Sequence, residues 1–147
     1  MTHRFLAHTA DIRVAIDAPT LRGLLEELIE VLRPLTVGTR TVRPRTAREI
    51  ALEAPDAAEL LLAFSREVLD AFQLDGFVAA RVELDTLTEP PGPTPAPGPL
   101  ALRGRLIGEP FDPARHETQP EIKALTRHGL VAAPAAGGWH AELLFDV

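Results

Sequence analysis

The chain has 147 residues, a formal net charge of −6 and no cysteine. This length suits one domain, so we expect a single domain over residues 1–147. The lack of cysteine excludes disulfides, zinc–thiolate sites and a cysteine nucleophile. No signal peptide or membrane-spanning apolar run is visible, so the default expectation is a cytoplasmic protein without a membrane partner. The acidic balance argues against direct nucleic-acid binding as the main function.

Two apolar stripes at helical spacing predict two helices. The first follows Thr20, a good N-cap residue, and we expect it to end at Pro34 because proline lacks an N–H. Asp56 and Glu59 form a capping box of the aspartate type at the start of the second helix. Gly76 is expected to end this second helix, since glycine readily adopts the left-handed conformation of a C-cap.

Alternation of apolar and polar residues predicts the strands. The stretch at 88–99, with six prolines, cannot pair as a strand, so we interpret it as the loop of a hairpin. The resulting order, β-β-α-β-α-β-β-β-β, predicts an α+β fold: a two-layer sandwich with a mixed or antiparallel sheet and two helices on one side. The expected strands cover residues 4–7, 12–16, 50–53, 77–85, 100–109, 121–128 and 139–147.

Acidic groups gather near the last predicted strand. The carboxylate of Asp146 lies next to the terminal carboxylate of Val147, and two anions at a strand end suit a hard cation if a third oxygen ligand joins them. Asp11 could supply that ligand if the first and last strands are neighbours. Two other interpretations stay open: Asp11 or Thr9 caps a turn, and the end of the chain is solvated.

Lys123 is the only lysine among the 15 lysines and arginines. Its ammonium group is a compact, strongly hydrated point charge that the planar guanidinium of arginine does not reproduce. Composition alone leaves both chance and function open for this position.

Other polar residues give weaker signals. His116 and His128 are candidate ligands or acid–base groups, although His128 shares a face with apolar residues and is expected to be a core histidine. Glu109 and Asp112 could act as paired carboxylates, but nothing specific marks them. Ser65, the only serine, has no nucleophile-elbow motif, which argues against a serine hydrolase. The sequence also has no glycine-rich loop of the P-loop or dinucleotide-binding type.

Several motifs occur together over almost the whole chain, and their combination resembles the archease family. Each motif alone is a weak signal, whereas their order and spacing make the combination specific. The motifs are HTADI at 8–12, GE-x-FD at 108–112, His116, EIKALT-x-H at 121–128, Trp139 and the final Phe145-Asp146-Val147.

The resemblance implies an accessory function. Archeases act with the RtcB-type RNA ligase, which joins RNA ends in tRNA splicing and RNA repair. They promote guanylylation of the ligase and its multiple turnover, and they are not known to ligate RNA themselves. The resemblance therefore implies an enzyme activator rather than an enzyme.

The resemblance also assigns roles to individual positions. Asp11 and Asp146 match the metal-binding carboxylates of the family, with the Val147 carboxylate beside them. Lys123 matches the functional lysine of the family. The implied cofactor is a divalent ion: calcium, magnesium or manganese. Weaker candidates for activating the partner are His8, Glu121 and His128.

Two alternatives remain beside this interpretation. The chain could be a chaperone or specificity modulator of a tRNA methyltransferase, or of another tRNA-modifying enzyme, and would then bind it without depending on Lys123 or the aspartates. It could also be a metal-dependent phosphoesterase that uses Asp11 and Asp146 with His8 or His116.

Overall fold

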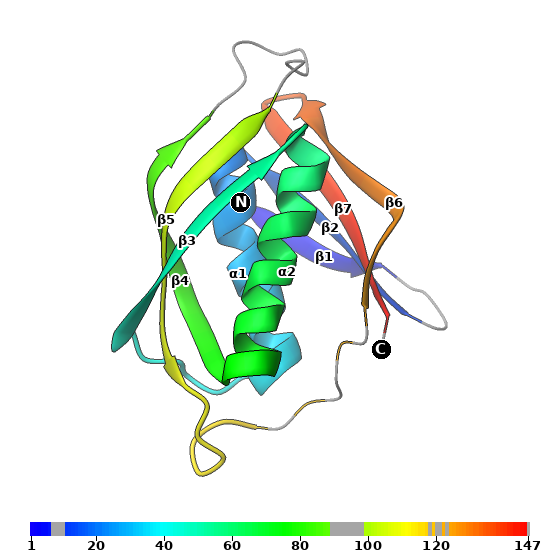
Figure 1. Ribbon diagram of the computed structural model, residues 1–147. Helices are drawn as coiled ribbons and strands as arrows, with labels where there is room; N and C mark the ends of the chain where they lie inside the picture. The colour runs from blue at the N-terminus through cyan, green and yellow to red at the C-terminus, as the bar shows by residue number, and fades with distance from the viewer. Residues whose placement is uncertain (7–10, 89–98, 118, 120–121, 123, 147) are drawn as a thin grey trace.

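Two antiparallel sheets enclose two helices in the computed structural model (Figure 1). The structure describes residues 1–6, 11–88, 99–117, 119, 122 and 124–146. The elements in chain order are β1 (Thr2–Leu6), β2 (Asp11–Ala18), α1 (Leu21–Val37), β3 (Thr46–Ala54), α2 (Ala57–Asp75), β4 (Phe77–Leu87), β5 (Leu100–Pro110), β6 (Ala124–Ala135) and β7 (Gly138–Asp146).

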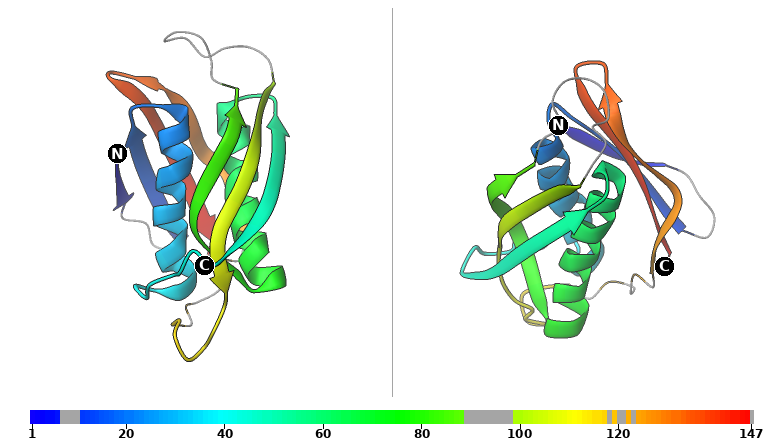
Figure 2. Two further views of the ribbon diagram at one scale, coloured as in Figure 1. Left: turned by 90° about the vertical axis from the view of Figure 1, so that its left-hand side faces the viewer. Right: turned by 45° about the horizontal axis from the view of Figure 1, so that its top comes forward.

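The predicted element order, the α+β class and the antiparallel pairing are confirmed. The arrangement differs from the expected two-layer sandwich, because the strands form two sheets with the helices between them instead of one sheet with both helices on one side. One sheet has the order β1-β2-β7-β6 and the other the order β3-β5-β4. Each helix contacts strands of both sheets, and Figure 2 shows the sheets on opposite sides of the helices. A helix that is apolar on more than one side must be covered from more than one side, and α1 and α2 have buried residues around much of their circumference.

The capping residues predicted for both helices are confirmed. The Thr20 Oγ1 accepts a hydrogen bond from the Gly23 N–H at 3.0 Å, and the Asp56 Oδ1 accepts one from the Glu59 N–H at 2.8 Å. Gly76 ends α2 in the left-handed conformation, with φ of 66° and ψ of 28°. These bonds satisfy backbone groups that have no partner within the helix.

The prediction that α1 ends at Pro34 is wrong, because the helix continues to Val37. Pro34 has no N–H to donate to the preceding turn, but its own carbonyl oxygen accepts from the Gly38 N–H at 3.0 Å. The Thr36 Oγ1 also donates to the Arg33 carbonyl oxygen at 2.9 Å. A proline so close to the end of a helix removes one bond without preventing the last turn.

The strands flanking the proline-rich stretch form the predicted hairpin. In the β4–β5 pair, Leu87 lies opposite Leu102. Residues 89–98, which make up most of that stretch, lie outside the described part of the chain. The last two strands differ in extent from the prediction: β6 begins at Ala124 and reaches Ala135, beyond the predicted end at residue 128, and β7 begins at Gly138.

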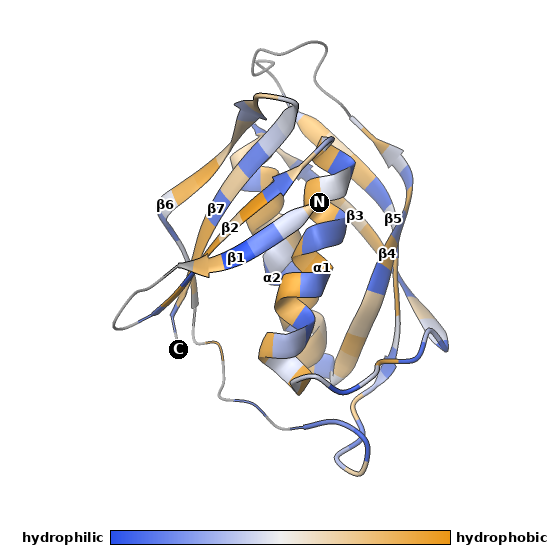
Figure 3. Cartoon of the chain, turned by 180° about the vertical axis from the view of Figure 1, so that it is seen from behind, coloured by the Kyte–Doolittle hydropathy of each residue, from blue (hydrophilic) through white to orange (hydrophobic). Residues whose placement is uncertain are grey.

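Strands β2 and β7 each present one apolar and one polar face. Val14 and Ile16 of β2, with Leu143 and Phe145 of β7, belong to the hydrophobic core beneath the helices. Because successive side chains in a strand point to opposite faces, the alternate residues lie on the outer face of the sheet. Figure 3 shows the alternation of hydrophilic and hydrophobic residues along these strands.

Neither α1 nor α2 combines the length and the apolar character needed to cross a membrane, and the described part of the chain holds no other helix.

Candidate functional site

The structure brings Asp11 and Asp146 together. Strands β2 and β7 are antiparallel neighbours, and in their register Asp11 lies directly opposite Asp146. Side chains of directly opposite residues share a face, with Cβ atoms roughly 4.5–5.5 Å apart. Both residues are half-buried. Like charges that face each other across a strand pair are unfavourable, and a positive charge bound between them would relieve the repulsion.

The donor chemistry of this pair fits a hard divalent cation. Carboxylate oxygens are the ligands that calcium and magnesium prefer. Among the described residues, no group of three histidine, aspartate or glutamate side chains is close enough to hold a metal ion. A complete coordination sphere would therefore need ligands beyond Asp11 and Asp146. Four of the predicted site residues, His8, Glu121, Lys123 and Val147, lie outside the described part of the chain.

A third strand reaches the same end of the sheet. Ala124, which follows Lys123 in the sequence, pairs with Asp146 in the β6–β7 register. The strands β2, β7 and β6 thus meet at one edge, where they present Asp11, Asp146 and the start of β6. This edge joins segments that the sequence separates widely.

His128, expected as a core histidine, is exposed. The β6–β7 register shifts between Thr126 and Val131, and Gly129 adopts a φ of +71° inside this irregularity. The irregular segment interrupts the alternation on which the prediction relied, so the side chain turns to solvent.

A different carboxylate, Glu109 at the end of β5, is buried, with 2% of the residue exposed. It accepts hydrogen bonds from the Arg43 backbone N–H at 2.6 Å and the Arg43 Nε at 3.2 Å, and also from the Arg115 guanidinium. Burial raises the pKa of Glu109, but the bonds from Arg115, the Arg43 backbone and His116 outweigh it and lower the pKa to about 2.

His116 supports this cluster. Its Nδ1 accepts from the Asp112 backbone N–H at 2.9 Å, so its Nε2 carries the proton that Glu109 accepts at 3.2 Å. Both ring nitrogens are used to fix the loop after β5. The sequence contained the signal for Glu109 and His116, since both belong to the motif region 108–116, but the long-range partner Arg43 could not be predicted.

A chain of charged side chains crosses the outer face of β1, β2 and β7. The His140 Nδ1 lies 2.7 Å from the Asp17 Oδ1, and its Nε2 lies 3.1 Å from the Glu142 Oε2. Arg4 donates to Asp17 at 3.1 Å, and Arg13 donates to Glu142 at 2.6 Å. The hydrogen bonds to Asp17 and then Glu142 raise the pKa of His140. Because alternate residues of a strand share a face, His140 and Glu142 lie on the same side of β7, but the sequence does not show their partners Asp17 and Arg13.

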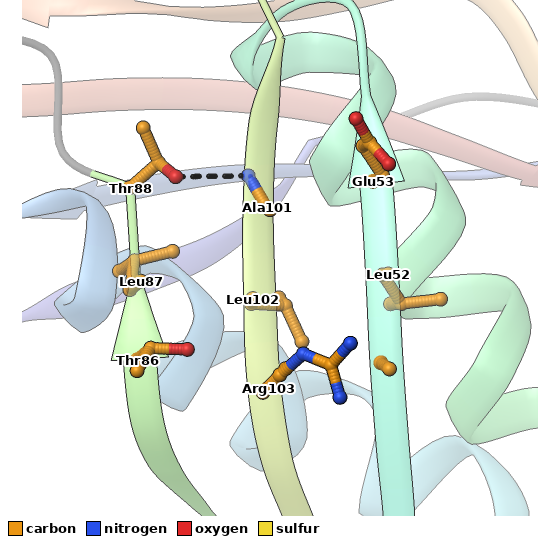
Figure 4. Close-up of a pocket in the computed structure, with 9 residues that line it drawn as sticks. Leu52, Glu53, Thr86, Leu87, Thr88, Ala101, Leu102 and Arg103 are labelled. Atoms are coloured by element: carbon orange, nitrogen blue, oxygen red, sulfur yellow. Dashed lines mark hydrogen bonds between the residues drawn. The ribbon is translucent and has the colours of Figure 1, made fainter.

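A shallow pocket of about 330 Å³ lies on the other sheet, where β3, β4 and β5 are adjacent (Figure 4). Its polar side chains include Glu53, Thr86 and Arg103, and the Thr88 Oγ1 accepts from the Ala101 N–H at 3.2 Å. None of the predicted site residues lines it. The pocket is therefore separate from the Asp11–Asp146 pair.

These features define a class of small, cysteine-free α+β protein in which two antiparallel sheets enclose two helices and two carboxylates face each other at paired strand ends. The archease protein family model matches residues 3–147, so the chain belongs to the archease family. The resemblance found in the sequence motifs is confirmed.

Sequence relatives span nearly the full chain. The archease of Methanopyrus kandleri is 32% identical over 142 residues, which cover 97% of this chain and 96% of that protein. The archease of Pyrococcus furiosus is 30% identical over 141 residues, covering 95% and 94%. The archease of Methanosarcina mazei is 28% identical over 145 residues, covering 99% and 95%.

Solved structures show the same fold. The solution structure of protein 1598 from Methanobacterium thermoautotrophicum has a TM-score of 0.73 at 21% identity and covers 99% of this chain and 98% of that chain. The crystal structure of an archease from Thermotoga maritima, described as a possible chaperone, has a TM-score of 0.58 at 21% identity, with coverage of 97% and 94%.

Proposed function

We propose that this archease-family protein is a cation-binding accessory protein that activates an RtcB-type, GTP-dependent RNA ligase. It would promote guanylylation of the ligase and its multiple turnover in tRNA splicing and RNA repair. The observation that carries the proposal is the register of β2 and β7, in which Asp11 faces Asp146.

Asp11 and Asp146 would hold a calcium, magnesium or manganese ion, with the Val147 carboxylate as a further ligand. Because the two facing carboxylates are both negative, they favour an added cation, which replaces the repulsion between two anions with attraction to one ion. When bound, this ion supplies positive charge for an oxygen of the ligase or its nucleotide. The chain's own contribution is to hold the two carboxylates at one edge of a sheet whose other face is packed on the core.

Lys123 is the second element of the proposed activating site. A lysine ammonium can neutralise a phosphate or pair with an acidic group of a partner. The proposal places it with the aspartates on the strength of its motif and of Ala124, its neighbour in sequence, which pairs with Asp146. His8, Glu121 and His128 are weaker candidates for the same contact surface, and exposed His128 is accessible to a partner.

Two observations favour an activator over a phosphoesterase or another hydrolase. Ser65, the only serine, is fully buried in α2 and cannot meet a substrate. His116, one of the two histidines considered for phosphoester chemistry beside His8, is buried and uses both ring nitrogens within the Glu109 cluster. Neither residue is available to attack a phosphate ester or to activate water for the attack.

A second candidate is a chaperone or specificity modulator of a tRNA methyltransferase or another tRNA-modifying enzyme. The description of the Thermotoga maritima archease as a possible chaperone favours it. A modulator of this kind acts through a binding surface and would not require Asp11, Lys123 or Asp146.

The deciding experiment measures GTP-dependent guanylylation and multiple-turnover RNA joining by the ligase of the same organism. The ligase is assayed alone, with this protein, and with the Asp11→Ala, Lys123→Ala and Asp146→Ala variants. Asp85→Ala is the matched control, because Asp85 is an exposed carboxylate on the other sheet. Circular dichroism is used to check that each variant is folded.

The proposal predicts stimulation that Asp85→Ala retains and the other three variants lose. Stimulation that survives all three substitutions would support the ligase as the partner but would contradict the site formed by Asp11, Lys123 and Asp146. No stimulation by the folded protein would favour the methyltransferase modulator, which stable binding to that enzyme would then test.

A further inference from the structure

Arg13 lies beside the carboxylate pair on the same face of the sheet. It is two residues after Asp11 in β2, so both side chains point to the outer face, about 7 Å apart along the strand. The Arg13 side chain is 43% exposed. A long, flexible and partly exposed arginine in this place has access to Asp11 and Asp146, to which it is a natural counter-ion.

The structure instead shows Arg13 directed along the sheet toward Glu142. The Arg13 Nη2 donates to the Glu142 Oε1 at 2.6 Å. In the β2–β7 register Arg13 lies opposite Leu144, so this contact runs diagonally away from Asp146. Glu142 therefore decides which way the guanidinium points.

The Glu142 carboxylate is itself held in place from the opposite direction. Its Oε2 lies 3.1 Å from the His140 Nε2, and the other ring nitrogen of His140 lies 2.7 Å from Asp17. Arg4 of the edge strand β1 completes the row by donating to Asp17 at 3.1 Å. A carboxylate whose two oxygens have separate partners has little freedom to follow Arg13 elsewhere.

Guanidinium groups and metal ions compete for the same carboxylate oxygens. An arginine that turned onto Asp11 or Asp146 would neutralise charge and occupy lone pairs that a cation needs. We propose that Glu142 is a positioning residue that holds Arg13 away from the Asp11–Asp146 pair and thereby preserves the affinity of the pair for a hard divalent cation. This inference rests on the cation site of the proposed function.

The test is a titration with Mn²⁺, in which electron paramagnetic resonance reports the free aqueous ion. Glu142→Gln keeps the size of the side chain but weakens its hold on Arg13, and we expect it to reduce Mn²⁺ affinity roughly tenfold. Arg13→Leu removes the competing guanidinium, and we expect affinity equal to or above that of the wild type. In the Arg13→Leu background, the further change Glu142→Gln is expected to have little effect.

Two variants separate this inference from the proposed function. Asp11→Asn removes a proposed ligand, so it should abolish binding. Glu83→Gln is the matched control for Glu142→Gln, since Glu83 is also a partly exposed carboxylate that pairs with arginine, but on the other sheet. It should leave the affinity unchanged.

The outcomes are distinct. Binding that Asp11→Asn abolishes and Glu142→Gln leaves unchanged would overturn the positioning role and leave the cation site standing. A Glu142→Gln effect of equal size with and without Arg13 would show that Glu142 acts through its own charge, which also overturns it. Absence of Mn²⁺ binding by the wild type would remove the cation site and this inference together.

Discussion

Carboxylates at the strand ends have different surroundings in the two sheets. Glu109, at the end of β5, is buried and receives hydrogen bonds from Arg43, Arg115 and His116 of its own chain. Asp11 and Asp146, at the paired ends of β2 and β7, are half-buried and face each other. The comparison teaches that the surroundings of a carboxylate decide its role. Arginines of the same chain make Glu109 part of the fold, whereas the two aspartates face a like charge and are where we propose that an external cation binds.

The largest expected effect comes from Glu109→Gln. The pKa of Glu109 is about 2 in the folded chain against an ordinary value of 4.5. A lowered pKa stabilises the folded state above pH 4.5, and this contribution is lost as the pH falls toward 2. The shift corresponds to on the order of 3 kcal/mol at neutral pH.

Urea unfolding at pH 7 and at pH 3 measures this effect. We expect the variant to lose about 3 kcal/mol of unfolding free energy at pH 7 and distinctly less at pH 3. Glu83→Gln, at a more exposed carboxylate that also pairs with arginine, should stay close to the wild type at both pH values. If the difference in unfolding free energy between Glu109→Gln and the wild type were the same at both pH values, the charge of Glu109 would not be what stabilises the fold.

Unlike Glu109→Gln, the substitution Asp146→Asn should not lower the unfolding free energy. Removing one of the two facing negative charges is expected to leave the cation-free protein as stable as the wild type, or more stable by up to about 1 kcal/mol. Thermal unfolding in EDTA and in excess Mn²⁺ measures both states. The wild type should gain stability from the ion while the variant should not, because only the wild type retains both of the proposed ligands. A loss comparable to that of Glu109→Gln would make Asp146 a structural carboxylate as well.

The smallest expected effect concerns His140, whose partners Asp17 and Glu142 raise its pKa above the ordinary 6.5. A raised pKa stabilises the folded state fully below pH 6.5, and this contribution is lost as the pH rises through the folded-state value. We expect His140→Gln to remove about 0.5–1 kcal/mol at pH 6 and less at pH 9. Urea unfolding at both values measures it. A cost that grows with pH would contradict the assignment.

The sequence predicted the features that depend on neighbouring residues. Thr20, Asp56 and Gly76 were identified as helix ends because caps act within a few positions. Pairing of β4 with β5 followed from their closeness in the chain. Pro34 was misjudged because its position in the last turn depends on where Gly38 closes the helix.

Features that depend on distant residues could not be predicted from local sequence patterns. The division into two sheets and the alignment of Asp11 with Asp146 arise from pairings between remote strands. His128 was misplaced because a shift in register near Gly129 interrupts the alternation. The Glu109 cluster needed Arg43, which lies 66 positions away.

The pairing of β2 with β7 has a consequence for how the protein is made. Asp11 and Asp146 meet across nearly the whole length of the chain. The entropic cost of closing so long a loop delays such a contact until other contacts have shortened the effective distance. During synthesis, a ribosome-bound chain that has not yet released β7 has only one of the two aspartates in place. Cation uptake would therefore mark a fully assembled molecule, and incomplete chains would remain unloaded.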